Sequence, residues 1–285
     1  MRIEFLGTGG ATTTPRPGCQ CRVCVEAREL GVPYSRSGPA VFVHGPDILI
    51  DTPEEIKDQL NRAGIEHINA GTYSHWHPDH TMGRRVWEAL NVDFRNWPPS
   101  GDTTDIHLPE QVAIDFQSWL GLQEHFDFMA RQGYVRVHTV PDGESIEIEG
   151  VRVKPFRLAE DYVYAFLLES GDARVLIAPD ELVGWEPPAF ARGVDLAILP
   201  MGVVERDPLT GERKIAAGHP ILKLEATFSG TLQIVRQINA GRTILTHIEE
   251  QDGYSHDDLL TIQQALERDG DDIEFAYDTM IVDVG

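Results

Sequence analysis

Three histidines and one aspartate lie within six residues of this 285-residue chain, in the segment HWHPDH at positions 75–80. His75, His77, Asp79 and His80 offer imidazole and carboxylate groups, which are ligands that zinc, iron and manganese accept in proteins. A surface loop gains little from such a cluster, and a core would have to satisfy every ring nitrogen. The segment therefore predicts a metal site, either for one ion or as part of a site for two.

The three cysteines of the chain form a second group of candidate ligands. Cys19, Cys21 and Cys24 all lie in the segment PGCQCRVC. An odd number of cysteines at this spacing makes a poor disulfide framework, whereas closely spaced thiolates can converge on one zinc ion. The pattern predicts a structural zinc on a loop at about residues 18–25, with a fourth ligand from elsewhere in the chain.

Strands and turns must present these ligands. A strand expected at 68–74 leads into HWHPDH, where Pro78 argues against a regular helix. Apolar spacing predicts helices at 53–63, from residue 82 onward, at 111–131, 231–239 and 257–268. Further strands are expected at 3–6, 40–43, 48–50, 135–140, 145–148, 151–156, 163–169, 175–177, 196–199, 243–245, 274–276 and 280–282. Runs of strands in each half, with helices between them, predict two sheets packed face to face with helices outside.

The composition limits the class of partner. The chain has 24 Lys+Arg against 46 Asp+Glu, a formal net charge of −22, and a field of that sign repels nucleic acid. No apolar stretch approaches the roughly 18 residues of a membrane span, and the N-terminal MRIEFLGTGG lacks the pattern of a signal peptide. These features predict a cytoplasmic protein with no membrane partner, and they allow a homodimer.

Four further segments, each following an expected strand, complete the pattern around SHWHPDH. They are FLGTGG, ILIDTP with Asp51, APD with Asp180, and ILTHIE with His247. Together these segments resemble the metallo-β-lactamase superfamily over nearly the whole chain. The resemblance implies an α/β fold, the four-layer αβ/βα sandwich, as a single domain spanning residues 1–285.

The same resemblance implies a site for two divalent ions, manganese, zinc or iron. It places His75 and His77 on the first ion, Asp79, His80 and His247 on the second, and Asp180 between them. In such a site a metal-bound hydroxide attacks the substrate, while the ions stabilise charge on the transition-state oxygens. Asp79 is therefore also expected to be catalytic.

The cysteine loop narrows the resemblance to the phosphoribosyl cyclic phosphodiesterase branch, whose members carry a structural zinc on a C-x-C-x-x-C loop plus a distant histidine. This branch implies a metal-dependent phosphodiesterase that acts on a small, possibly cyclic ribose, phosphodiester. The pyrroloquinoline-quinone biosynthesis B proteins share a similar loop. Two alternatives therefore stay open: a hydrolase of a lactone, thioester or nucleic acid on the same fold, and a non-catalytic metal-binding accessory protein.

The chain departs from the superfamily pattern at two places. The segment PFRLAEDYVYAFLLE lacks the usual histidine of the first ion, and either Glu160 supplies an oxygen ligand there, which would favour manganese or iron, or Glu160 lies in solvent. In the phosphodiesterase branch a distant histidine completes the zinc site. At the corresponding position this chain has Glu250, and its nearest histidine is His256. Either Glu250 or His256 is expected to close the cysteine site.

Three expectations concern the surroundings of the site. Asp51 is expected to accept a hydrogen bond from a ligand histidine, although a role in capping its strand is also open. His219, in AAGHPILK, is the candidate general acid toward the leaving oxygen. Residues 91–133 are expected to form a substrate-side insertion at the mouth of the pocket.

Overall fold

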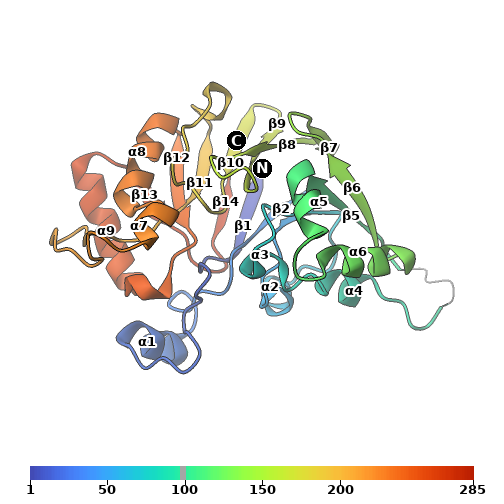
Figure 1. Ribbon diagram of the computed structural model, residues 1–285, viewed down its shortest axis with the longest axis horizontal. Helices are drawn as coiled ribbons and strands as arrows, with labels where there is room; N and C mark the ends of the chain where they lie inside the picture. Colours follow the sequence, from blue (N-terminus) through green and yellow to red (C-terminus); the bar gives the residue numbers. More distant parts are fainter. Residues whose placement is uncertain (97–100) are drawn as a thin grey trace.

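The computed structural model describes residues 1–96 and 101–285, and these residues form two seven-stranded sheets (Figure 1). The first sheet has the order β14 (Ile281–Asp283), β1 (Arg2–Gly7), β2 (Ala40–His44), β3 (Ile48–Ile50), β4 (Ala70–Thr72), β5 (Thr104–Pro109) and β6 (Val135–Val140). The second has the order β13 (Ile273–Phe275), β12 (Arg242–Thr246), β11 (Leu196–Pro200), β10 (Ala173–Ile177), β9 (Tyr164–Ser170), β8 (Val151–Arg157) and β7 (Ile146–Ile148).

Each sheet is antiparallel in one half and parallel in the other. Strands β3 to β6 run parallel in the first sheet, and β10 to β13 run parallel in the second. Parallel neighbours bring their carboxyl ends to the same edge of a sheet, where ligands of α/β folds commonly bind. The loops that follow β3 and β4, and those that follow β10 and β12, therefore gather four separate segments of the sequence at the sheet edges.

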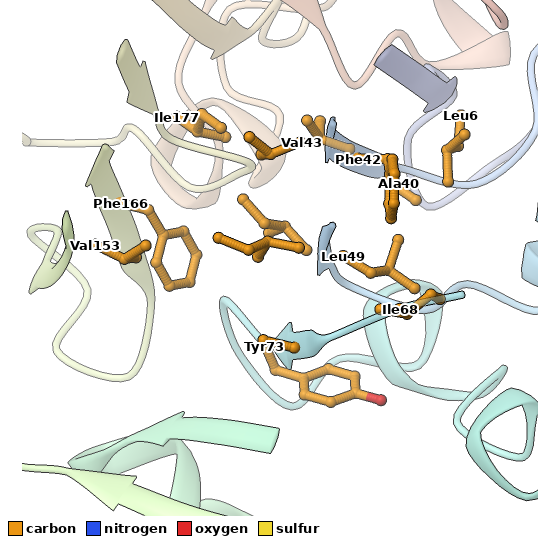
Figure 2. Close-up of a cluster of buried hydrophobic side chains, with 14 of the residues drawn as sticks. Leu6, Ala40, Phe42, Val43, Leu49, Ile68, Tyr73, Val153, Phe166 and Ile177 are labelled. Atoms are coloured by element: carbon orange, nitrogen blue, oxygen red, sulfur yellow. The ribbon is translucent and has the colours of Figure 1, made fainter. Parts of the chain in front are cut away.

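The main hydrophobic core lies between the two sheets. Val43 of β2, Val153 of β8, Phe166 of β9 and Ile177 of β10 are all buried in one cluster, and Figure 2 shows this cluster. A second cluster packs the outer face of the second sheet against helices α8 (Phe228–Ile238) and α9 (His256–Asp269), through residues such as Ile234 of α8. The second sheet thus has buried side chains on both of its faces, as a sheet that is covered on two sides requires.

Helices form the two outer layers. Figure 1 shows α8 and α9 outside one sheet and α5 and α6 on the opposite side of the molecule. The four-layer αβ/βα sandwich expected from the sequence is thereby confirmed. The helices are α1 (Arg22–Leu30), α2 (Ile56–Ala63), α3 (Pro78–Thr81), α4 (Val86–Asn91), α5 (Glu110–Phe116), α6 (Leu122–Arg131), α7 (Ile221–Leu224), α8 (Phe228–Ile238) and α9 (His256–Asp269), with 3-10 turns η1 (Ala189–Ala191) and η2 (Glu250–Asp252).

Three sequence expectations were wrong in detail. Pro78 does not prevent a helix: it is the first residue of α3, where its missing N–H has no helical partner to lose. The helix expected over 111–131 is broken into α5 and α6, because Leu120 and Gly121 both adopt left-handed backbone angles. Helix α1 was not expected at all. It begins within the cysteine loop, with Cys21 as its N-cap and Cys24 among its buried residues.

Part of the segment expected as an insertion, 91–133, belongs to the fold itself. Strand β5 pairs with both β4 and β6 within the first sheet. Trp119, between α5 and α6, stacks on Trp76 with ring centroids 4.7 Å apart, so this loop does approach the HWHPDH segment. Residues 97–100 of the expected insertion lie outside the described part of the chain. Among the described residues, no helix is long and apolar enough to cross a membrane.

A buried carboxylate near the C-terminus holds the loop that follows β1. Asp278 accepts hydrogen bonds from the backbone N–H and hydroxyl of Thr8 at 3.0 and 2.9 Å, and from the backbone N–H of Ser37 at 3.0 Å. It also pairs with Arg62 at 3.1 Å and is only 1% exposed. Thr8 begins the glycine turn, so Asp278 fixes that turn against the sheet.

Replacing Asp278 with alanine should lower the free energy of unfolding by about 3 kcal/mol, because several buried donors lose their acceptor together. Urea unfolding monitored by circular dichroism measures the loss. Asp283→Ala is the matched control, since Asp283 pairs with Arg2 on the surface and is expected to contribute less than about 1 kcal/mol. Equal stability losses in the two variants would contradict this role of Asp278.

Candidate metal centre

The HWHPDH segment changes from extended to helical backbone at Pro78. His77 is the N-cap of α3 with extended angles (φ −56°, ψ 149°), and Asp79 and His80 lie in the single turn that follows. Because the backbone turns between His77 and Asp79, the first two histidines and the last two residues face different positions. The local sequence thus divides one segment into two pairs of ligands.

The first ligand group contains His75, His77 and Asp180. Their ligand atoms lie within 4.8 Å of one another, although Asp180 follows β10 more than 100 residues later. Nε2 of His75 is 3.7 Å from Oδ2 of Asp180, and the His75 side chain is fully buried. Burial, followed by the neighbouring histidines, lowers the pKa of His75, so its ring stays neutral and can use a nitrogen lone pair as a ligand.

The second ligand group contains Asp79, His80 and His247, again within 4.8 Å of one another. Oδ2 of Asp79 lies 3.3 Å from Nε2 of His80 and 3.6 Å from Nε2 of His247. Oδ2 of Asp180 lies 3.8 Å from the same nitrogen of His80 and 3.6 Å from that of His247. Asp180 therefore stands between the two groups, as the sequence resemblance implies.

The contacts of the buried ring nitrogens show whether the donor set fits metal ions. Among the described residues, Nε2 of His75, His80 and His247 are buried without a hydrogen-bond partner. Buried polar atoms normally have a hydrogen-bond partner. Each of these three ring nitrogens instead lies less than 4 Å from a carboxylate oxygen. A metal cation bound between them would give both the nitrogens and the carboxylates a partner. The residues fit two divalent ions.

Asp51 fixes the orientation of His80, as expected from the sequence. Its carboxylate accepts hydrogen bonds at 2.8 Å from Nδ1 of His80 and from both the backbone N–H and the hydroxyl of Ser74. Because Nδ1 of His80 donates to Asp51, its Nε2 is left with a lone pair directed at the ligand group. Asp51 itself has a left-handed backbone (φ 65°), which turns the chain out of β3.

The glycine turn after β1 closes the other side of the site. Glu249 accepts hydrogen bonds from the backbone N–H groups of Ala11 and Thr12 at 2.9 and 3.1 Å. A Cβ on Gly10 would lie 2.1 Å from the Glu249 carboxylate and 2.9 Å from Nδ1 of His247. The absence of a side chain at Gly10 is therefore what lets this turn approach the ligand histidine.

The cysteine loop forms a separate ligand group with Glu250. Oε1 of Glu250 lies 3.2, 3.0 and 3.0 Å from the sulfur atoms of Cys19, Cys21 and Cys24. His256, the other candidate for the fourth ligand, instead packs its ring against Tyr34 and Tyr277 at centroid distances of 5.7 Å. Of the two alternatives, the geometry favours Glu250, which is 3% exposed and sits one residue after Glu249.

If this loop binds zinc, replacing Glu250 with alanine should release the ion, whereas His256→Ala should retain it. Burial is the largest cause that raises the pKa of Cys24 to about 12, so zinc uptake displaces a proton there and should weaken as the pH falls. Zinc per chain is measured by elemental analysis at pH 8 and pH 6. Zinc loss from the His256 variant alone would identify the histidine as the ligand.

A cavity of about 320 Å³ opens beside the two ligand groups. Its lining includes His77, Asp79, Asp180 and His247, together with residues from the glycine turn and from α7. His219 lines a neighbouring cavity of about 400 Å³, which shares residues such as Glu249 with the first. The His219 side chain is exposed, and its Nδ1 accepts a hydrogen bond from the backbone of Ile221, so it does not contact the ligand groups directly.

The sequence left two alternatives open at the position of the missing histidine, and the structure favours the one in which Glu160 lies in solvent. Glu160 is exposed and belongs to neither ligand group. The ring of Tyr162 instead lies against His75 and His77, with centroids 6.2 and 5.6 Å apart. The first group therefore has two histidines and Asp180 but no third ligand of its own among the described His, Cys, Asp and Glu residues.

Sequence reasoning missed two further carboxylates that line the cavity. Burial, followed by Asp180, raises the pKa of Glu181 to about 8 and that of Glu225 to about 7. Glu181 directly follows Asp180 in the APDE segment, and its place beside a candidate ligand was a usable signal. Glu225 lies just after the four-residue helix α7, and no sequence pattern distinguishes it from an exposed glutamate.

The chain belongs to the metallo-β-lactamase-fold hydrolase family: the beta-lactamase superfamily domain matches residues 46–248, more than half of its length. This fold is typical of metal-dependent hydrolases. The superfamily inferred from the sequence is thereby confirmed.

Particular relatives show a similar architecture over almost the entire chain. A diphosphatase of the PhnP family is 23% identical, with 99% of this chain and 97% of that one aligned and a TM-score of 0.72. Zinc-bound PqqB from Methylobacterium extorquens is 17% identical, with 99% and 100% aligned and a TM-score of 0.74. The short form of human tRNase Z is 17% identical over 100% of both chains, with a TM-score of 0.64. At these identities the likeness concerns the fold alone.

One curated relative matches over a shorter segment. An octanoyltransferase of Porphyromonas gingivalis is 34% identical over 84 residues, which are 29% of this chain and 17% of that protein. This chain thus covers less than a fifth of the relative's length.

Proposed function

We propose that this protein is a metal-dependent phosphodiesterase that hydrolyses a small phosphodiester, possibly a cyclic phosphate on ribose. The observation that carries the proposal is the pair of three-ligand groups joined by Asp180, with their unsatisfied nitrogens beside a cavity of about 320 Å³. A cavity of this size admits a small molecule. The structural likeness to a PhnP-family diphosphatase supports phosphorus ester chemistry.

In the proposed reaction, water adds to phosphorus, one phosphorus–oxygen ester bond breaks, and the departing oxygen takes a proton. Divalent ions in such sites lower the pKa of water and offset charge that develops on oxygen. His75, His77 and Asp180 would hold one ion, and Asp79, His80 and His247 would hold the other with Asp180. His219, on the wall of the adjoining cavity, is the candidate to protonate the departing oxygen.

The same observations argue against nucleic acid as the substrate, although tRNase Z shares the fold. Protein surfaces that bind RNA neutralise its phosphates with lysine and arginine. The chain carries a formal charge of −22, and no lysine or arginine is among the described residues that line the 320 Å³ cavity. A small-molecule ester is therefore the substrate we expect.

Turnover of generic aryl phosphodiesters and of cyclic ribose phosphates by manganese- or zinc-loaded protein tests the proposal. The expected results are release of a phenol and a phosphomonoester from an aryl diester, and opening of a cyclic ribose phosphate to a single ribose phosphomonoester, both abolished in Asp79→Asn. Hydrolysis of thioesters or lactones with no action on any phosphodiester would replace this function with another ester hydrolysis on the same fold.

A non-catalytic metal-binding role is the second candidate. It is favoured by one observation of the site, that the described residues give the group of His75 and His77 no third ligand besides the shared Asp180. The structural likeness to PqqB also supports it. An accessory protein of this kind should hold at most one ion outside the cysteine loop. Elemental analysis of protein in which Glu250 is replaced by alanine would count the ions of the active-site groups alone.

A further inference from the structure

The wall of the 320 Å³ cavity is acidic beyond what metal ligation requires. Glu181, Glu225 and Glu249 line it in addition to Asp79 and Asp180, and the described lining residues include no lysine or arginine. With two divalent ions bound and all five carboxylates ionised, the cavity would still carry a net charge of about −1 before any substrate entered. Such a cavity disfavours substrates with several negative charges.

Glu181 and Glu225 differ from Glu249 in having no internal partner. Glu249 is engaged by the backbone N–H groups of the glycine turn. In the described part of the chain, neither Glu181 nor Glu225 makes a side-chain hydrogen bond or an ion pair. Glu181 is nevertheless only 7% exposed, and its remaining contact with solvent is through the cavity. A buried carboxylate without a partner is costly, and a cation in the cavity would relieve that cost.

The position of Glu181 is fixed by the structure around it. Glu181 has a left-handed backbone (φ 55°), an uncommon conformation for a residue other than glycine, which surrounding structure must impose. Burial, followed by the charge of Glu181, raises the pKa of Tyr162, whose ring lies against His75 and His77.

We propose that Glu181 and Glu225 bind a cationic ammonium group on the alcohol portion of the substrate, so that the preferred phosphodiester is zwitterionic. The inference rests on the proposed phosphodiesterase function and adds the substrate class to it. The phosphodiester group carries the single negative charge that faces the ligand groups, and the ammonium group faces the acidic wall. Phosphomonoesters and diphosphates without an ammonium group lack this charge distribution and should bind less well.

The test compares two diesters of p-nitrophenol with the same leaving group and nearly the same shape. In one the second ester is choline, and in the other it is 3,3-dimethylbutanol, in which carbon replaces the charged nitrogen. With metal-loaded protein, we expect kcat/KM to be about tenfold higher for the choline diester, because one favourable charge contact typically produces a difference of this size. The difference should come from a lower KM and not from a higher kcat. Equal kcat/KM values for the two diesters would overturn the inference.

Glu181→Gln and Glu225→Gln remove each charge while keeping the shape of the side chain. In each variant the ratio of kcat/KM between the two diesters should fall toward one. Glu212→Gln is the matched control, because Glu212 is exposed outside the cavity, and it should keep the ratio of the unaltered protein. A ratio that persists in both cavity variants would show that the preference has another origin and would overturn the assignment.

Binding measurements separate this inference from the proposed function. Isothermal titration calorimetry of metal-loaded protein with phosphocholine and with 3,3-dimethylbutyl phosphate requires no turnover. If no diester is hydrolysed, the proposed phosphodiesterase function fails. Tighter binding of phosphocholine, lost in Glu181→Gln, would still support the ammonium site, and equal binding of the two phosphates would reject it.

Discussion

Asp180→Asn should lower phosphodiester turnover about a thousandfold, the loss expected when several kcal/mol of transition-state stabilisation by metal ions disappear. The physical reason is the position of one oxygen, Oδ2, which lies within 3.6 to 3.8 Å of Nε2 of His75, His80 and His247. Asparagine keeps the shape but removes the negative charge and presents either a neutral oxygen or an N–H group. Both ions therefore lose a ligand at once.

Metal content and thermal unfolding check the same substitution independently of turnover. Ions that bind only the folded protein raise its unfolding temperature by mass action, so the rise on adding manganese or zinc should be much smaller in Asp180→Asn. The matched control is Asp105→Asn. Asp105 also contacts a histidine, His138 at 2.8 Å, but lies in a surface cluster outside the ligand groups. Full metal content and full turnover in Asp180→Asn would reject the two-ion site.

Substitutions of Asp51 should weaken metal binding without removing a metal ligand. Asp51→Asn keeps an oxygen for the Ser74 backbone but brings an N–H group to Nδ1 of His80. His80 then favours the tautomer that carries its proton on Nε2, the nitrogen needed for the metal, and affinity should fall 10- to 100-fold, the loss typical of such outer contacts. The left-handed backbone at Asp51 tolerates asparagine, so the fold should persist.

Asp51→Ala separates orientation from stability. Alanine leaves three buried donors of Ser74 and His80 without an acceptor and is strained at φ 65°, so the free energy of unfolding should fall by about 3 kcal/mol. Metal titration and urea unfolding of the two variants measure the two effects. If asparagine and alanine lowered stability equally while metal affinity stayed unchanged, Asp51 would be a structural residue only.

The proximity of the candidate metal ligands within HWHPDH followed from the sequence because they are near neighbours along the chain. Once a strand ends before His75 and the chain turns at Pro78, the four side chains cannot be far apart whatever the rest of the fold does. The cysteine loop is a similar case, since Cys19, Cys21 and Cys24 lie within six residues. Asp180 and His247 are more distant, and they were assigned through the family resemblance and its strand ends rather than through local spacing.

The sequence expectations were less successful where a side chain had to be chosen among neighbours. Both Glu250 and His256 were close enough in sequence to serve the cysteine loop. The choice depends on the direction of each side chain: Glu250 lies in the 3-10 turn that faces the sulfur atoms, whereas His256 begins α9 and packs between tyrosines. The same holds for Glu160, which points to solvent while Tyr162, two residues on, faces the ligand histidines.

By itself, the sequence determined the kind of chemistry: closely spaced imidazole, carboxylate and thiolate groups at strand ends, in a chain able to fold as an α/β sandwich. Only the tertiary structure decided how the cavity is charged. Glu181, Glu225 and Glu249 come from three separate segments, and they line one cavity because α7 and the loops that follow the parallel strands meet at a single edge. Local spacing constrains neighbours along the chain, whereas the composition of a cavity depends on strand order and side-chain direction, which no short segment encodes.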